Sequence, residues 1–262
     1  MADADELLRA GDLDGARAAL VEAIKRAPND QQGRIFLFQL LCISAEWDKA
    51  ATQLRALAQI SAEAQMLAMA YGQAIEAEKF RAQVFAGTAQ PALLVSSSPW
   101  AGDLVGALAA LTQGRLEDAE TLRDQAFDAA PDTPGELDGV AFDWLADGDA
   151  RFGPALEAII AGQWGLVPFD AIQKITSEGP RDLRDVVWYP VQIAFKTGQS
   201  VAALLPARYP GSETSADTAL RLTRATDWAD QPWGQAGVGQ HEWSLSDGTD
   251  VGLLSLRSLV FR

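Results

Sequence analysis

The stretch that decides the fold of the C-terminal half spans residues 179–213 and reads GPRDLRDVVWYPVQIAFKTGQSVAALLPARYPGSE. Apolar residues alternate with polar or small ones over 191–196 and again over 201–205, and a Thr-Gly-Gln turn separates the two segments. Alternation of this kind on both sides of a short turn is typical of a β-hairpin. Pro206 ends the second segment, because proline has no N–H to donate to a sheet ladder. The stretch therefore predicts a hairpin at the centre of a β-sheet.

Shorter segments extend this sheet in both directions along the chain. Residues 172–176 predict a further strand, and segments 240–246 and 251–261 flank an Asp-Gly pair that favours a tight turn. Residues 152–161 carry apolar side chains at helical spacing before Gly162, which predicts a short helix that ends at the glycine. Together these segments predict an α+β unit of about five short antiparallel strands and one or two helices, with the small sheet curled toward a partial barrel.

The first half carries a degenerate helical repeat. The pattern GDLDGA at 11–16 returns as AEWDKA at 45–50 and as GRLEDA at 114–119, and the first two copies are 34 residues apart. A 34-residue period with a small residue at the helix contact resembles the tetratricopeptide (TPR) pattern, in which each helix pair packs against its neighbours. We expect about six helices between residues 3 and 130, one of them a long helix over 61–86, and a concave face lined by the leading helices.

Two prolines and a glycine at 131–135 mark the boundary between the halves, because PDTPG cannot continue a helix. Six of the eight tryptophans follow this point, and the apolar period changes there from helical to two-fold. We therefore predict a degenerate TPR-like helical repeat domain over 1–135, an α-α superhelix, and an α+β domain over 136–262. A second break at 87–99, with two prolines and a serine run, predicts a connector that docks through its Leu-Leu-Val segment.

The chain is strongly acidic, with 36 aspartates and glutamates against 21 lysines and arginines and a net charge of −15. The excess is spread over both halves, and no run of basic residues interrupts it. Nucleic acid and anionic lipid surfaces are therefore poor partners, because both would be repelled. A basic or amphipathic protein surface would be attracted; the alternative is that the charge serves only to keep the protein in solution.

Cys42 is the only cysteine, so the chain can form neither an internal disulfide nor a thiolate-rich zinc site. It lies within the apolar stretch 35–43, where a buried packing residue is a better interpretation than a nucleophile. The N-terminus lacks the basic and apolar regions of a secretory signal, and no apolar run approaches the ~20 residues that span a bilayer. We expect a cytoplasmic protein without membrane insertion.

The main polar candidate site lies in and just after the hairpin stretch. Its charged and aromatic members form one candidate interaction cluster: Asp182, Arg184, Asp185, Trp188, Arg208, Tyr209 and Glu213. An arginine fork between carboxylates could bind an anionic ligand, and Ser212 could act as a nucleophile. The simpler interpretation is that Arg184 or Arg208 pairs with an aspartate and pins the loop to the sheet, since nothing in the sequence supplies Ser212 with a base.

Two further candidates are weaker. His241 shares strand parity with Trp243, which places it on the apolar side as a hydrogen-bonded packing residue, and one histidine makes a poor metal site. Asp143, Asp147 and Asp149 resemble the alternating acids of a calcium loop, but the loop glycine and the closing glutamate are missing. Helix capping and a solvated turn explain these aspartates better. We therefore predict no metal site and no bound cofactor.

Several of these segments together resemble one protein family. They are GVAFDWLADGDARFGPALEAIIAGQWGLVPF at 139–169, PRDLRDVVWYP at 180–190, LLPARYPGSE at 204–213, RATDW at 224–228 and VGQ at 238–240. The series is similar to the ImpE family, also called TagJ, the accessory proteins of bacterial type VI secretion loci. The likeness covers essentially the whole chain.

The resemblance implies a non-enzymatic protein that helps to assemble or recycle the contractile sheath of the secretion system. It implies docking on the small subunit of the sheath through that subunit's N-terminal helix, near the ClpV-type disassembly ATPase. We expect the partner helix to lie in a groove of the stacked helices, held by apolar anchors and steered by the acidic field.

Two rival functions stay open. One is a repeat adaptor for another cytoplasmic client. The other is an enzyme that acts on an anionic small molecule at Arg184, Arg208 and Glu213, with His241 nearby. A solvent-filled pocket that joins these groups would favour the enzyme, whereas pairing and burial of the same groups would speak against it.

Overall fold

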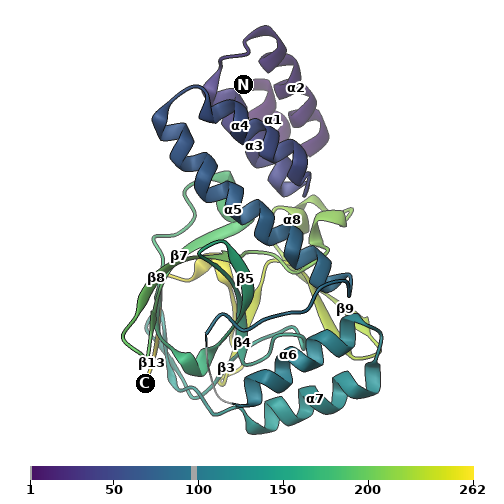
Figure 1. Cartoon of the computed structure of the whole chain (residues 1–262), viewed down its shortest axis with the longest axis vertical. Coiled ribbons are helices and arrows are strands. Elements are labelled where there is room, and N and C mark those ends of the chain that lie inside the picture. Colours follow the sequence, from purple (N-terminus) through teal and green to yellow (C-terminus); the bar gives the residue numbers. More distant parts are fainter. Residues whose placement is uncertain (1, 96–98) are drawn as a thin grey trace.

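The computed structural model describes residues 2–95 and 99–262, with helices in its first half and strands in its second (Figure 1). Seven α-helices precede the first strand of the described chain. They are α1 (Ala2–Arg9), α2 (Leu13–Arg26), α3 (Gln31–Ile43), α4 (Trp47–Ala58), α5 (Ala62–Phe85), α6 (Pro99–Thr112) and α7 (Leu116–Ala129). A further short helix, α8 (Thr218–Arg221), lies in the second half. Of the helices in the described ranges, none combines the length and the apolar character needed to cross a membrane.

The second half is an antiparallel β-sheet curled into a partial barrel, which confirms the predicted fold class (Figure 1). The prediction of about five strands is too low, because the described residues form 13. The strands are β1 (Gly135–Leu137), β2 (Val140–Phe142), β3 (Leu145–Asp147), β4 (Ala155–Ile160), β5 (Gln163–Pro168), β6 (Ile172–Thr176), β7 (Trp188–Phe195), β8 (Ser200–Pro206), β9 (Thr226–Gln231), β10 (Gly234–Gly239), β11 (Glu242–Leu245), β12 (Asp250–Gly252) and β13 (Ser258–Phe261). Eight form one sheet in the order β2-β1-β13-β6-β7-β8-β4-β5, and the described chain adds a β12-β11-β3 sheet and a β10-β9 ribbon.

The hairpin predicted from the central stretch is confirmed as β7 and β8. Val191 lies opposite Ala203 and Ile193 lies opposite Val201 in the ladder. Val191 and Ile193 are at most 5 % exposed, so the alternation does mark the face that points into the barrel core. The strand predicted over 172–176 is β6, which pairs with β7.

The short helix predicted over 152–161 is wrong, because most of these residues form β4. Five of its six residues are buried, so its apolar residues do not alternate. A strand covered on both faces is a continuous apolar run, which periodicity cannot distinguish from a helix. Ala161 (φ 50°) and Gly162 (φ 78°) then reverse the chain into β5, as a two-residue hairpin turn requires.

The helical repeat is interrupted after its second unit. Helices α1 to α4 stack at one end of the molecule, where Ala16 and Ala50 are fully buried as the repeat pattern predicts (Figure 1). The long helix predicted over 61–86 is α5; its 24 residues make it about 36 Å long. It therefore carries the chain across the barrel before α6 begins. The third unit, α6 and α7, consequently packs beside the barrel, where Trp100 Nε1 donates to Asp170 at 3.1 Å.

The leading helices α3 and α5 turn one face toward the barrel, and barrel residues fill that face. Trp188 lies against Trp47 and Tyr71 with ring centroids 5.7 Å apart in both pairs, and Tyr71 meets Phe38 edge-on at 6.0 Å. The 3₁₀ turn η2 (Leu183–Val186) packs on α3. The expectation of an open trough along these helices is therefore wrong over this part, because the aromatic rim of the barrel buries itself there.

The predicted connector covers one edge of the large sheet. Leu94 N–H donates to Leu166 O at 3.0 Å, and Leu166 N–H donates to Ala92 O at 2.9 Å. Residues 92–94 therefore run parallel to β5 and satisfy an edge that would otherwise be open. Residues 96–98 of the connector lie outside the described part of the chain.

Candidate functional site

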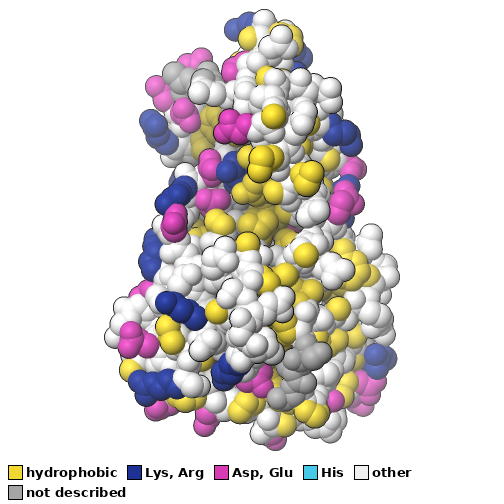
Figure 2. Space-filling view, turned by 60° about the vertical axis from the view of Figure 1, so that its left-hand side comes forward, with side chains coloured by type: hydrophobic (Ala, Val, Ile, Leu, Met, Phe, Trp, Pro, Cys, Tyr) yellow, Lys and Arg dark blue, Asp and Glu magenta, His cyan; other side chains and the backbone are white. Residues whose placement is uncertain are grey.

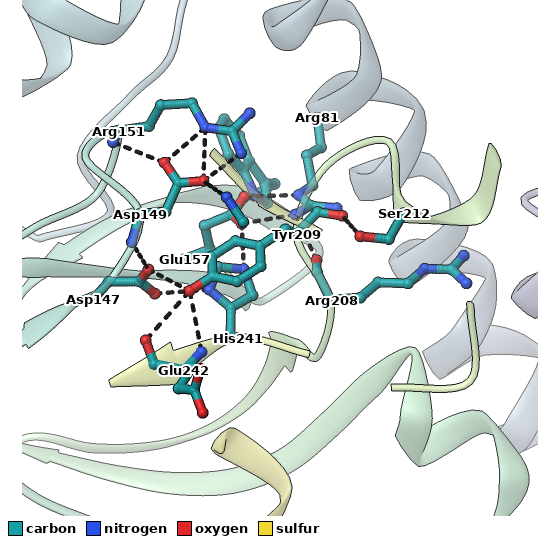
Figure 3. A network of polar contacts seen from close by, with 12 residues as sticks. Arg81, Asp147, Asp149, Arg151, Glu157, Arg208, Tyr209, Ser212, His241 and Glu242 are labelled. Atoms are coloured by element: carbon teal, nitrogen blue, oxygen red, sulfur yellow. Dashed lines mark hydrogen bonds and ion pairs between the residues drawn. The ribbon is translucent and has the colours of Figure 1, made fainter. Parts of the chain in front are cut away.

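A chain of buried ion pairs joins α5 to the interior of the barrel (Figure 3). The Glu157 carboxylate on β4 lies at its centre: Arg81 on α5 donates to it from Nε and Nη2, both at 2.7 Å, and His241 Nε2 lies 3.0 Å away. Trp164 Nε1 also donates to Glu157, at 2.9 Å. Arg81 and Glu157 are only 6 % and 3 % exposed, so they pair away from water. A buried bidentate pair of this kind fixes the position of α5 on the sheet.

His241 extends the network to β3. Its Nδ1 lies 2.7 Å from Oδ2 of Asp147, the last residue of that strand. Burial alone would lower the pKa of His241, but the Asp147 and Glu157 carboxylates outweigh it and raise the pKa to about 9. Burial likewise tends to raise the pKa of Glu157, and Arg81 brings that pKa down to about 2. At neutral pH the imidazole is therefore a cation that Glu157 and Asp147 hold from two sides, and burial raises the pKa of Asp147.

Tyr209 and Ser212 of the RYPGSE segment complete the network. The Tyr209 hydroxyl donates to Asp147 at 2.8 Å and accepts from Glu242 N–H at 3.1 Å. Ser212 Oγ donates to Tyr209 O at 2.6 Å and accepts from Gly239 N–H at 2.8 Å. Ser212 is fully buried, and in the described chain its hydroxyl meets backbone groups and no base. This serine therefore orders the turn.

Arg208 inserts into the end of helix α3. Its Nη1 donates to Ile43 O at 2.6 Å and to Arg221 O at 3.1 Å, and its Nη2 donates to Cys42 O at 3.2 Å. The last carbonyls of a helix lack partners inside the helix and carry partial negative charge. The guanidinium supplies hydrogen-bond donors and a positive charge at this position. These hydrogen bonds tie the barrel to the helical half. Because Arg208 is only 4 % exposed, a ligand cannot reach it.

The DLRD turn before β7 fastens the barrel to α3 and α5 in a second place. Asp182 and Asp185 form a capping box around η2. Arg184 pairs with Asp182 and lies over the ring of Tyr71, 4.8 Å from its centroid. From α3, Gln39 donates to Asp182 at 3.3 Å.

The predicted interaction cluster thus divides into two fastenings. Asp182, Arg184, Asp185 and Trp188 belong to the DLRD turn, and Arg208 and Tyr209 to the RYPGSE segment, where Glu213 is half-buried. The cluster does not converge around a solvent-filled pocket, since Arg208 and His241 are buried and paired. The enzyme hypothesis is therefore left without the site that it needs.

The interpretation of Asp147 and Asp149 as a solvated turn is wrong. Asp147 is 5 % exposed and Asp149 is fully buried. Asp149 pairs with Arg151 and accepts a hydrogen bond from Gly237 N–H at 2.8 Å. Asp143 is exposed, as expected of a solvated turn. The two buried aspartates are members of the ionic network instead.

The sequence patterns do not single out Glu78, Arg81 or Glu157. Glu78 accepts a hydrogen bond from Trp188 Nε1 at 3.2 Å and pairs with Arg81 inside the molecule. The signal that was available is a charge inside an apolar run, as in ALEAII at 155–160. A charged residue in such a run is buried only when it is paired.

A groove open to solvent lies between α5 and the outer face of the sheet. Its volume is about 720 Å³. Small and apolar side chains form its floor and its α5 wall: Ala70, Tyr71, Ala74, Ile159, Pro190, Ala202 and Leu204. Glu178 and Arg181, from the loop between β6 and η2, and Asp185 of η2 also line it. Figure 2 shows hydrophobic side chains gathered in the waist between the helical stack and the barrel.

The apolar wall of this groove continues along α5. Met66 and Met69 are 76 % and 70 % exposed. They precede Ala70 and Gln73, which line the groove, by four residues each, so the four side chains share one side of the helix. We call these four residues the methionine stripe. Exposed methionines are typical of surfaces that adapt to a bound partner.

Known proteins share both the sequence and the fold of this chain. Residues 139–260 match the family model described as ImpE protein. Over 258 residues the chain is 41 % identical to the type VI secretion system accessory component TagJ of Pseudomonas aeruginosa, a match that covers 98 % of the chain and 90 % of that protein. The crystal structure of protein VPA1032 from Vibrio parahaemolyticus has the same fold, with a TM-score of 0.87 and 24 % identity over 99 % of this chain and 97 % of that one.

Proposed function

The chain belongs to the ImpE family, and from this premise we propose that it is an accessory component of a type VI secretion system that binds a helical segment of the sheath's small subunit. The proposed occupant is the N-terminal helix of that subunit, and the proposed seat is the groove between α5 and the sheet. Binding there serves the assembly of the sheath or its recycling by a ClpV-type ATPase. The role is that of a cytoplasmic adaptor without catalysis.

One observation carries the proposal: the groove is open, apolar and continuous with the methionine stripe. A volume of about 720 Å³ suits several side chains from one face of a helix. Helices that bind in grooves present anchors three, four and seven residues apart, and the methionine stripe has the same spacing. Flexible thioether side chains can close around aliphatic or aromatic anchors of different shapes.

The seat lies on the flank of α5 and outside the helical stack. Trp188 and η2 already occupy the face of α3 and α5 that turns toward the barrel. A partner helix that entered there would have to displace buried aromatic rings. Docking on the flank leaves these contacts in place, so it needs no rearrangement of the core.

The charge of the chain supports a basic or amphipathic partner. The net charge is −15, Glu63 and Glu76 lie on α5, and Glu178 lines the groove. A field of this sign accelerates the approach of a basic helix, and salt weakens the effect. The rate of association should therefore fall as ionic strength rises.

The test is the binding of a fluorescent peptide that contains the N-terminal helix of the sheath's small subunit from the same secretion locus. Met66→Asp combined with Met69→Asp places two charges on the stripe and should weaken binding at least about 30-fold, as loss of an interface hot spot does. Leu116→Asp is the matched control, because Leu116 is an apolar residue on α7 that is 42 % exposed and does not line the groove.

Fluorescence anisotropy gives the three dissociation constants, and the control should bind as the wild type does. If the double variant binds the peptide as tightly as the control, the groove is not the seat. If the wild type does not bind the peptide but captures another cytoplasmic client through the same stripe, the alternative adaptor function is correct.

A further inference from the structure

We propose that the groove between α5 and the sheet is selective for a cation beside Asp185, which receives a lysine or arginine side chain of the docked helix. The site is the groove of the proposed function, so the inference rests on that function. It adds a chemical preference that small molecules can measure. The preferred occupant is an amphipathic helix that carries a basic residue beside its apolar anchors.

Asp185 is a buried carboxylate with one oxygen still available. It is 3 % exposed and lines the groove. Its Oδ2 accepts the N–H groups of Arg181 at 2.7 Å and of Asp182 at 2.8 Å. No described residue donates a hydrogen bond to its Oδ1. Oδ1 is not fully enclosed by the protein, so a donor that enters the groove can reach this acceptor.

The arginines next to Asp185 in the chain are engaged elsewhere. Arg184 pairs with Asp182 and lies over the ring of Tyr71. Arg181 pairs with Glu178, and the side chains of both are more than 70 % exposed, so this pair stays in water at the rim. Within the described residues Asp185 forms no ion pair. A cation that enters the groove therefore meets a carboxylate whose charge is not yet neutralised.

The apolar walls of the groove make this carboxylate selective. Ala74, Ile159 and Leu204 line the same groove with apolar atoms, and attraction between charges is stronger beside such atoms than on a fully solvated surface. A neutral donor would gain one hydrogen bond, whereas an ammonium or guanidinium would also neutralise a buried charge. We expect a preference of about tenfold for a cation over a neutral donor on an alkyl chain of the same length.

The experiment compares n-hexylammonium with 1-hexanol, which share an apolar chain and differ in the charge of the head group. Both are titrated into the full-length protein, and the amide resonances of Arg181 and Asp182, which donate to Asp185, report binding beside this carboxylate. Hexylammonium should shift these two resonances with a dissociation constant about tenfold below that of hexanol. Equal dissociation constants, or shifts that avoid these two resonances, would overturn the proposal.

Two variants separate this contact from general attraction to an acidic protein. Asp185→Asn keeps an acceptor oxygen for the two backbone N–H groups and should abolish the preference for the ammonium. Glu178→Gln removes an exposed carboxylate of the same groove and should leave most of the preference for the ammonium. If Asp185→Asn does not fold, the wild type at about 0.5 M salt decides, because screening removes surface attraction but not a buried contact. Loss of the preference at that salt concentration would overturn the proposal.

The peptide of the proposed function provides an independent measurement. Each of its lysines and arginines is replaced in turn by glutamine and tested against the wild type and Asp185→Asn. One replacement should weaken binding to the wild type about tenfold and leave binding to the variant unchanged. Peptide binding that depends on the methionine stripe but on no such coupling would overturn this inference and keep the proposed function. If the protein prefers the ammonium but does not bind the peptide, the cation preference stands and the proposed function is overturned.

Discussion

Replacement of Arg81 by alanine removes the guanidinium that pairs with two buried carboxylates. Arg81 holds Glu157 through two hydrogen bonds of 2.7 Å, lies 3.4 Å from a Glu78 oxygen and donates to Arg208 O at 3.0 Å. Without it, Glu157 keeps His241 as a partner, but Glu78 loses its ion pair. Both carboxylates remain inside the molecule, at 3 % and 6 % exposure.

Removal of one partner from a buried ion pair costs about 3–5 kcal/mol, because the remaining charge stays away from water. Arg17→Ala is the matched control: Arg17 pairs with Asp14 and Glu46, but its side chain is 33 % exposed and that of Asp14 is 77 % exposed. Surface pairs contribute about 1 kcal/mol or less. In a protein of roughly this size 1 kcal/mol changes the melting temperature by about 2–4 °C. Arg81→Ala should therefore melt about 6–20 °C below the wild type, and Arg17→Ala within about 4 °C of it.

Urea unfolding followed by circular dichroism at pH 7 gives the free energy of unfolding of each variant, and calorimetry gives its melting temperature. The double replacement Arg81→Met with Glu157→Met should recover part of the loss, because apolar residues of similar volume often substitute well for a buried pair. If Arg81→Ala unfolds at the same urea concentration as Arg17→Ala, the buried pair does not hold α5 on the barrel. Arg81 would then contribute no more to stability than an exposed arginine does.

Three further predictions concern the same core. The pKa of His241 is raised from 6.5 to about 9, so its stabilising contribution is full below pH 6.5 and is lost as the pH rises through 9. The urea midpoint of the wild type should therefore fall over this interval, whereas that of His241→Gln should not. Gly237→Ala should lower the free energy of unfolding by about 1–3 kcal/mol in thermal melts, since its Cβ would lie 2.2 Å from the Tyr209 ring. Arg208→Met should speed amide hydrogen exchange in the elements packed on the last turn of α3, whereas Met at the exposed Arg224 should not.

The hairpin of β7 and β8 can be predicted from the sequence because its signal is local. Val191, Ile193 and Val201 alternate with polar or small residues, since one face of each strand is buried and the other is not. The burial of the repeat alanines Ala16 and Ala50 can also be predicted from the sequence, because a small residue is needed wherever two helices approach closely. In both cases the physical requirement falls on residues a few positions apart.

β4 and the ionic network escape prediction because their requirements are not local. β4 is covered on both sides, so nothing in ALEAII distinguishes a strand from a helix. Arg81 and Glu157 are separated by 76 residues, and Asp147 and His241 by 94. A charge taken alone is expected in solvent, and burial becomes favourable only when the distant partner is in place. Sequence can raise suspicion of Glu157 within an apolar run but cannot name its partners.

The most distinctive motifs of the sequence, DLRD and RYPGSE, serve mainly to hold the fold together. Arg208, Tyr209 and Ser212 use their polar atoms on bonds inside the protein. A side chain whose donors and acceptors are already satisfied has little to offer a partner, so such motifs hold the barrel and the helices together. Asp185 of DLRD lines the groove, and its Oδ1 receives no donor from the described residues. Recognition is therefore best sought where this fastening meets the surface, at Asp185 and along the methionine stripe.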